Sequence, residues 1–192
     1  MYDLLLRNGT LLDPAAGINA PRDIAVRGGR VAAIMEPGTP AQAVRSVDVR
    51  GLFVCPGLID FHVHVFPGVS HFGIEADSTC LARGVTTVLD FGTTGGLIFD
   101  GFRRYVLDAA QTRVYALLHI AGQGMISSSG TLPSLGELAD LRYCNVENVE
   151  RTVAAHRDRI VGIKVRMYNG LTTLAPLAAA RELADEVGLP MV

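Results

Sequence analysis

Two histidines separated by one residue are the first candidates for chemistry in this chain. His62 and His64 end the run Pro56-Gly57-Leu58-Ile59-Asp60-Phe61-His62-Val63-His64, which is apolar and typical of a strand. Side chains alternate between the two faces of a strand, so these two imidazoles point to the same side. Two imidazoles on one face can hold one divalent cation, and the neighbouring Asp60 shares that face. We therefore predict that His62 and His64 are metal ligands rather than packed core histidines.

The only lysine of the chain lies in another apolar run. Lysine and arginine together number 17, yet Lys164, within Ile160-Val161-Gly162-Ile163-Lys164-Val165, is the sole lysine. Burial would lower its pKa and favour the neutral amine, which can attack carbon dioxide to give a carbamate. A carbamate has two anionic oxygens and can bridge two cations. We therefore predict that Lys164 is the third ligand, as N6-carboxylysine, and keep an ion-paired or snorkelling lysine as the alternative.

Weaker signals follow other strand-like runs. Thr94 lies in a loop of threonine and glycine, Gln123 lies between Gly122 and Gly124, and Tyr168 follows Lys164. These positions make Thr94, Gln123 and Tyr168 candidate substrate-binding residues. His119, in Leu117-Leu118-His119-Ile120, either lines the site or packs in the core.

Composition excludes several classes of partner. A net charge of -2 without basic runs gives no electrostatic footprint for nucleic acid. No uninterrupted apolar run approaches the length of about 18 residues that a membrane span needs. The three scattered cysteines are typical of reduced thiols, and no signal peptide is evident at the N-terminus. We expect a cytoplasmic protein with a small-molecule substrate, and a homo-oligomer is one of the assemblies that the sequence leaves open.

The remaining pattern predicts an α/β fold in two parts. Residues 1–52 alternate short strands with turns at Asn8-Gly9 and Gly28-Gly29, which indicates the N-terminal part of a small β-sandwich module. Residues 53–192 alternate strands with helices, which predicts a parallel sheet. The expected strands are 58–65, 85–91, 113–121 and 159–167, and the expected helices are 74–83, 99–110, 146–157 and 174–187. A TIM-type (β/α)8 barrel needs roughly 250 residues, so we expect only its first half here.

The β module, the run Pro56 to His64 and Lys164 together resemble the amidohydrolase superfamily of metal-dependent hydrolases. The resemblance implies that His62 and His64 bind the more buried metal and that a carbamylated Lys164 bridges two metals, usually zinc. It also implies two further histidines from strands five and six and a catalytic aspartate from strand eight, all beyond residue 192. We therefore expect a full-length protein about twice this size, with two zinc ions per subunit, and little activity from the 192 residues alone.

Within the superfamily, Gly84 to Asp90, Phe99 to Arg103 and Thr112 to Val114 are most similar to the dihydroorotase-like deacetylase subgroup. This similarity implies hydrolysis of an amide or ester (acyl) bond in a small molecule by metal-activated water. A true dihydroorotase carries an arginine shortly after the second histidine, whereas Val65-Phe66-Pro67-Gly68 follows here. Cyclic amide hydrolysis of the dihydroorotase or hydantoinase kind is the alternative, and a non-catalytic scaffold is the alternative of another class.

Overall fold

The computed structural model describes residues 1–127, 136–167, 171 and 173–192. Two compact units divide the chain, Met1–Pro56 and Gly57–Val192. The domain boundary drawn from the sequence, between residues 52 and 53, lies close to this division. No helix among the described residues is long and apolar enough to cross a bilayer.

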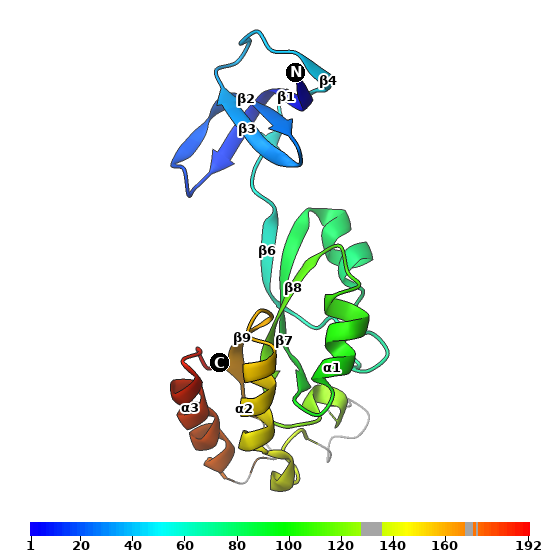
Figure 1. The fold of residues 1–192 in the computed structure, drawn as a ribbon, viewed down its shortest axis with the longest axis vertical. Coiled ribbons are helices and arrows are strands. Elements are labelled where there is room, and N and C mark those ends of the chain that lie inside the picture. The colour runs from blue at the N-terminus through cyan, green and yellow to red at the C-terminus, as the bar shows by residue number, and fades with distance from the viewer. Residues whose placement is uncertain (128–135, 168–170, 172) are drawn as a thin grey trace. The chain divides into compact units, whose positions relative to one another are not determined.

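A single mixed sheet forms the first unit (Figure 1). Its strands are β1 (Tyr2–Asp13), β2 (Ile18–Arg27), β3 (Arg30–Met35), β4 (Ala43–Asp48) and β5 (Phe53–Val54). The order is β3-β2-β1-β4, and β5 pairs with β1 beyond β4. Gly28 and Gly29 both have positive φ and make the tight turn between β2 and β3.

One turn expected in this unit is absent. Asn8 and Gly9 were expected to close a hairpin, but β1 continues through them as one strand. Asn8 has a φ of 65°, and the pairing of β1 with β2 shifts register between Leu6 and Gly9. The left-handed asparagine therefore makes a bulge and not a hairpin. The buried carboxylate of Asp23 on β2 holds this bulge by accepting the backbone N–H of Asn8 at 2.9 Å.

The second unit contains a four-stranded parallel sheet in the order β6-β7-β8-β9. Its strands are β6 (Leu58–Val63), β7 (Val85–Gly95), β8 (Arg113–His119) and β9 (Ile160–Lys164). Sequence order and spatial order coincide, as repeated βαβ units of one hand require. β7 runs four residues past the predicted end at Phe91, so the expected loop at Thr93 and Thr94 is part of a strand.

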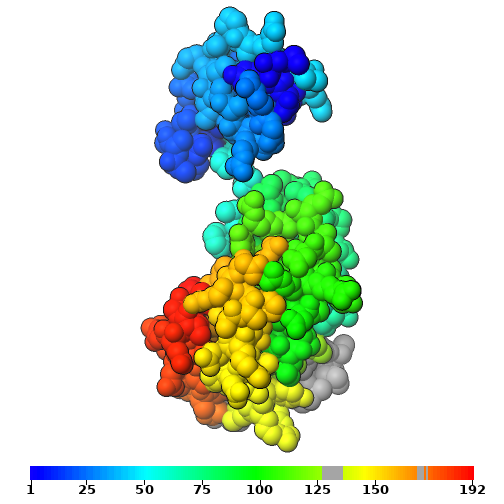
Figure 2. Space-filling view, in the orientation of Figure 1, coloured from blue at the N-terminus to red at the C-terminus, as the bar shows by residue number. Residues whose placement is uncertain are grey.

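The connecting helices are less regular than the sequence pattern indicated. The predicted helix 74–83 is a π-helical turn, η1 (Ala76–Cys80), followed by a 3-10 turn, η2 (Leu81–Arg83). The predicted helix 99–110 is a short α1 (Phe99–Phe102) that widens into the π-helical η3 (Arg103–Leu107). The remaining helices are η4 (Gly124–Ser127), η5 (Leu141–Tyr143), α2 (Val146–Ala155) and α3 (Ala175–Val187). The two longest of these helices, α2 and α3, lie side by side; Figure 2 shows α2 in yellow and α3 in orange to red.

The two faces of the parallel sheet have different roles. Val63, Val88, Val114 and Ile163 belong to one buried apolar cluster that also contains residues of the helices. Because strand side chains alternate, the residues next to them in sequence point to the opposite face. His62, His64, His119 and Lys164 lie on that face. By the same alternation Phe61 lies on the side of Val63, and it is nevertheless 68% exposed. The chemistry-bearing side chains thus lie on the face that the helices leave uncovered.

The last residues of the chain continue the sheet. The carbonyl of Pro190 accepts the N–H of Ile163 at 2.9 Å, and the N–H of Val192 donates to the carbonyl of Ile163 at 2.9 Å. Met191 forms a parallel bridge with Ile163. Residues 190–192 therefore lie beside β9 and pair with it in the parallel direction.

Gly95 allows the closest approach of backbone segments in this unit. It pairs with His119 across β7 and β8, and a Cβ at this position would overlap the carbonyl oxygen of Ala121. We expect Gly95→Ala to lower the free energy of unfolding by about 3 kcal/mol or more, because backbone must move to relieve the overlap. Urea unfolding followed by circular dichroism measures this change.

The matched control is Gly101→Ala. A Cβ on Gly101 would meet no atom within 4 Å, and Gly101 lies in the helix α1, where alanine is favoured over glycine. This variant should keep or raise the stability by up to about 1 kcal/mol. Equal stability losses in the two variants would contradict the steric argument.

Candidate metal centre

His62, His64 and Lys164 line one cavity of about 610 Å³. The two histidines come from β6 and the residue that follows it, and the lysine is the last residue of β9. All three therefore lie toward the carboxyl ends of parallel strands, where α/β enzymes place their active sites. Phe72, Met125 and Arg166 complete the lining.

A chain of hydrogen bonds fixes the ring of His64. Its Nδ1 lies 2.9 Å from the hydroxyl of Thr93, and that hydroxyl donates to Asp90 Oδ2 at 2.6 Å. A hydroxyl that donates its one proton to a carboxylate must accept from the ring, so Nδ1 of His64 carries the proton. The lone pair on Nε2 is then available as a metal ligand, as in carboxylate-supported histidine ligands of metalloenzymes.

Asp90 is the last group in this series of hydrogen bonds, and its side chain is completely buried. It also accepts the backbone N–H of Val65 at 2.9 Å and that of Thr93 at 2.7 Å. Burial raises the pKa of this carboxyl to about 6, although these hydrogen bonds act in the opposite direction. Asp90 thereby ties the segment after β6 to β7 and sets the position of His64.

Phe91 contacts two of the predicted ligands, and sequence reasoning missed it. The ring of His62 stacks on the ring of Phe91 with centroids 3.8 Å apart, and Lys164 Nζ lies 4.1 Å from the same centroid. The signal was available, because alternation from the buried Val88 and Asp90 turns Phe91 to the face of the two histidines. Gly92 follows with a φ of 82°, and a Cβ there would collide with the stem of Lys164.

The cavity disfavours positive charge on two of its groups. Burial lowers the pKa of His64 to about 4, with a further contribution from the charge of His62. Burial also lowers the pKa of Lys164, and the nearby Arg166 acts in the same direction. Both shifts favour the neutral bases, which are the forms that bind metals or attack electrophiles.

A second polar group lies deeper beside Lys164. His119 is fully buried, pairs in register with Lys164, and accepts the backbone N–H of Ala121 on Nδ1 at 2.9 Å. Burial lowers the pKa of His119 to about 4. The buried carboxylate of Glu137, which sequence reasoning also missed, binds Arg166 at 2.7 Å. Glu137 lies outside every predicted strand and helix, so no periodicity pointed to it.

The three predicted substrate-binding residues are placed differently from one another. Thr94 is fully buried in β7, and its hydroxyl has no hydrogen-bond partner among the described residues. Gln123 donates from Nε2 to the carbonyl of Glu137 at 2.7 Å. Tyr168 lies outside the described residues.

The ligand set within the described residues consists of two imidazoles and one amine. These residues contain no group of three or more His, Cys, Asp and Glu side chains that could hold a metal ion. Lys164 is no metal ligand in its ammonium form, because an ammonium has no lone pair. A carbamate on Lys164 would add the oxygen donors that the two histidines lack.

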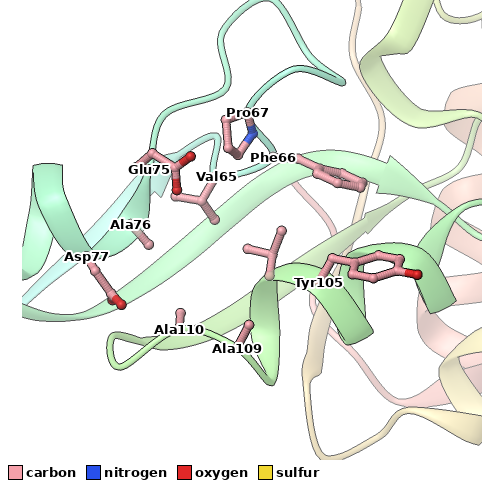
Figure 3. Close-up of a pocket in the computed structure, with 10 residues that line it drawn as sticks. Val65, Phe66, Pro67, Glu75, Ala76, Asp77, Tyr105, Ala109 and Ala110 are labelled. Atoms are coloured by element: carbon pink, nitrogen blue, oxygen red, sulfur yellow. The ribbon is translucent and has the colours of Figure 1, made fainter.

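A second cavity lies beside the segment that follows β6 and is lined by different side chains. It has a volume of about 270 Å³ and lies between the segment after β6, η1 and the residues of and after η3 (Figure 3). Its polar lining consists of Glu75, Asp77 and Tyr105, and both carboxylate oxygens of Asp77 already accept hydrogen bonds from residues 111 and 112. The pairing of imidazoles and amine is found only in the first of these two cavities.

The shifted groups predict how stability depends on pH without added metal. His64 and His119 have folded pKa values of about 4 against 6.5, so the unfolded chain binds more protons between these values and stability rises with pH. Asp90 has a folded pKa of about 6 against 3.8, so it binds more protons in the folded chain than in the unfolded one between these values. Its contribution to the free energy of unfolding therefore falls as pH rises through that window. Two histidines outweigh one carboxyl, and we expect a net rise in the free energy of unfolding from pH 4 to 6.5.

Urea unfolding in the presence of a chelator at several pH values checks this expectation. Asp90→Asn should steepen the rise, because the opposing group is removed, provided that the variant still folds. A stability that is constant or falls across this window would contradict the assignment of neutral, buried histidines.

Relatives with assigned names match most of this chain, although no protein-family model does. A deacetylase of Brucella anthropi is 30% identical over 178 residues, which are 91% of this chain and 43% of the relative. A deacetylase of Enterococcus faecalis is 31% identical over 192 residues, which are 96% of this chain and 47% of the relative. The chain thus spans less than half the length of these relatives.

Solved structures agree with the sequence matches. The crystal structure of a dihydroorotase matches 98% of this chain and 50% of its own, with a TM-score of 0.85 and 28% identity. The crystal structure of an adenine deaminase matches 100% of this chain and 50% of its own, with a TM-score of 0.82 and 29% identity. The chain is therefore homologous to proteins named deacetylase, adenine deaminase and dihydroorotase, and the solved structures that it matches belong to the amidohydrolase superfamily.

Proposed function

We propose that the protein carrying this chain is a metal-dependent hydrolase that cleaves an amide or ester (acyl) bond of a small molecule, with deacetylase-like specificity. The observation that carries the proposal is that His62, His64 and Lys164, from the first and fourth strands of the sheet, line one cavity. The names of the matched deacetylases support the acyl substrate.

The same proposal includes the finer architecture. The four parallel strands are the first half of a (β/α)8 barrel, and the first unit is part of a β-sandwich module. Support comes from the sequential strand order, from residues 190–192 beside β9, and from matched structures of which this chain covers 50%. The catalytic aspartate implied by the family lies beyond residue 192, so these residues alone are expected to be inactive.

The residues of the cavity suit divalent cations, with zinc as the expected metal. Imidazole nitrogens and carboxylate-type oxygens are zinc ligands in proteins. The hydrogen bond of His64 Nδ1 to Thr93 leaves the lone pair on Nε2 free to bind a zinc ion. When bound, the cations would lower the pKa of a water molecule to about 7 and polarise the substrate carbonyl. Thr93 and Asp90 would hold the tautomer of His64 throughout.

Lys164 would contribute as a carbamate. Its neutral Nζ attacks the carbon of carbon dioxide, a nitrogen–carbon bond forms, and one carbon–oxygen π pair moves onto oxygen. The nitrogen then loses a proton to solvent, which leaves an anionic carbamate with two oxygen donors. Burial of the amine and the glycine at position 92, which leaves room for the lysine stem, both support this role.

Cyclic amide hydrolysis is the second candidate, favoured by the match to the dihydroorotase structure. Phe66, two residues after His64, packs its ring on Phe102 at 5.1 Å and does not line the cavity. The arginine that a dihydroorotase carries after the second histidine is thus missing here, so a substrate carboxylate would need another cation. Among the described residues, Arg166 is the arginine that lines the cavity. Turnover of ring amides without turnover of acetyl compounds would favour this candidate.

Replacement of Lys164 tests the proposal directly. We expect Lys164→Ala to lower kcat of the protein carrying this chain by at least about 10³-fold, because a bridging ligand is lost. Millimolar short carboxylic acids should restore part of the activity by supplying the missing oxygens. Lys164→Arg is the matched control, since it keeps a cation but forms no carbamate and should stay inactive with or without the acid.

Metal analysis of the same preparations provides the second measurement. The wild-type protein should hold close to two divalent ions per subunit, and Lys164→Ala should hold fewer. A fully active Lys164→Ala protein, or a wild-type protein with far less than one bound metal, would refute the hydrolase proposal.

Two adjacent buried threonines allow a paired test of the support for His64. Thr93→Val removes the hydroxyl that accepts from His64, so metal affinity should fall about 10- to 100-fold. Thr94→Val removes a buried hydroxyl without a partner among the described residues, so it should leave metal affinity unchanged. Competition with a fluorescent zinc chelator measures both, and equal affinities in the two variants would exclude a role for the Thr93 hydroxyl.

A further inference from the structure

The ring of His119 contains a hydrogen-bond donor that nothing in the described chain uses. Nδ1 accepts the backbone N–H of Ala121 at 2.9 Å, so it has a lone pair and the neutral ring carries its proton on Nε2. This Nε2 is buried and has no hydrogen-bond partner among the residues of the described ranges. Buried unpaired donors are costly and rare, which indicates that an acceptor belongs beside this one.

The position of His119 indicates which acceptor that is. His119 and Lys164 are partners in the register of β8 and β9, so their side chains leave the sheet on the same face, about 5 Å apart at Cβ. Lys164 and Arg166 offer only donors when charged. The charge of the buried Glu137 acts to raise the pKa of His119. However, Oε1 of Glu137 already accepts a hydrogen bond from Arg166 Nη1 at 2.7 Å.

Other contacts keep the amine end of Lys164 within this face. Its Nζ lies over the ring of Phe91, and its stem runs over Gly92, where a side chain would collide with it. A group added to Nζ would therefore stay beside the sheet, within reach of a neighbouring donor on β8. A carbamate there would present two anionic oxygens, which form stronger hydrogen bonds than neutral acceptors.

We propose that His119 is a positioning residue that donates Nε2–H to an oxygen of the carbamate on Lys164. The inference depends on the proposed function, because it requires the carbamate. Carbon dioxide supplies the added carbon and both oxygens, and Nζ loses one proton to solvent as the nitrogen–carbon bond forms. His119 takes no part in that bond change; its N–H stabilises the anionic product and fixes the direction of its oxygens.

Two substitutions separate the two nitrogens of the imidazole. His119→Asn places an amide near Nδ1, so it keeps an acceptor for Ala121 but cannot reach the position of Nε2. His119→Gln places an amide near Nε2, so it keeps a donor toward Lys164 but loses the acceptor. Both variants are polar and smaller than histidine, and thermal unfolding verifies that each remains folded.

The readout is the carbamate itself. The protein carrying this chain is titrated with ¹³C-bicarbonate, and carbon NMR measures the occupancy of the carbamate resonance. Lys164 is the only lysine within these 192 residues, and Lys164→Arg identifies its signal against that of other amines. We expect His119→Asn to need about tenfold more carbon dioxide for half occupancy, and His119→Gln to stay within about threefold of the wild type.

Each result assigns or removes the role of His119. Equal occupancy in wild type and His119→Asn, or equal losses in the Asn and Gln variants, would overturn it. Normal carbamate in His119→Asn with a raised KM would show that the donor serves the substrate, which also overturns it. A wild-type protein without any Lys164-dependent signal would instead remove the carbamate, and with it the ligand role proposed for Lys164.

Discussion

The buried carboxylate of Asp90 is the constraint on which the site depends. It accepts hydrogen bonds from the Val65 N–H, the Thr93 N–H and the Thr93 hydroxyl, and through that hydroxyl it determines the tautomer of His64. These bonds connect the segment that leaves β6 to the end of β7, so the geometry of the first strand is set by the second. Partial compensation of a buried charge by several donors is the usual condition for keeping one inside a protein.

The parallel sheet converts a sequence pattern into a site by separating two environments. Valines and isoleucines on one face pack with the helices, while histidines and lysine on the other face line the cavity. Because the register places His119 beside Lys164, residues far apart in the chain become neighbours without any long loop. The site therefore rests on backbone hydrogen bonds of the sheet, which are more rigid than loop contacts.

Strand periodicity was the part of this structure that the sequence predicted well. The faces of His62, His64 and Lys164 followed from alternation, because a period of two leaves each residue only two directions. The irregular helices η1 and η3 could not be predicted, since a π-helical turn differs from an α-helical turn by one hydrogen bond and leaves no clear mark on apolar spacing. Asn8 misled for a similar reason, because the same left-handed residue suits a hairpin or a bulge.

Long-range partners of the site were also beyond sequence reasoning. Glu137, which lies outside every strand and helix predicted from the sequence, meets Arg166 only after the sheet has formed. Nothing local distinguishes Glu137 from a solvated glutamate, whereas in the fold it is buried and paired with Arg166, as buried glutamates usually are. The extension of β7 through Thr93 and Thr94 likewise depends on contact with β8, not on the residues themselves.

The scarcity of lysine in this chain has a practical consequence. An amine-directed acylating reagent has one side-chain target within these 192 residues, and that target faces the cavity. In protein freed of metal and carbamate, the rate of acylation of this lysine reports how accessible the cavity is, and competing small molecules can be ranked by the protection they give. A protein with lysines scattered over its surface would need engineering before it could offer such a single-site assay.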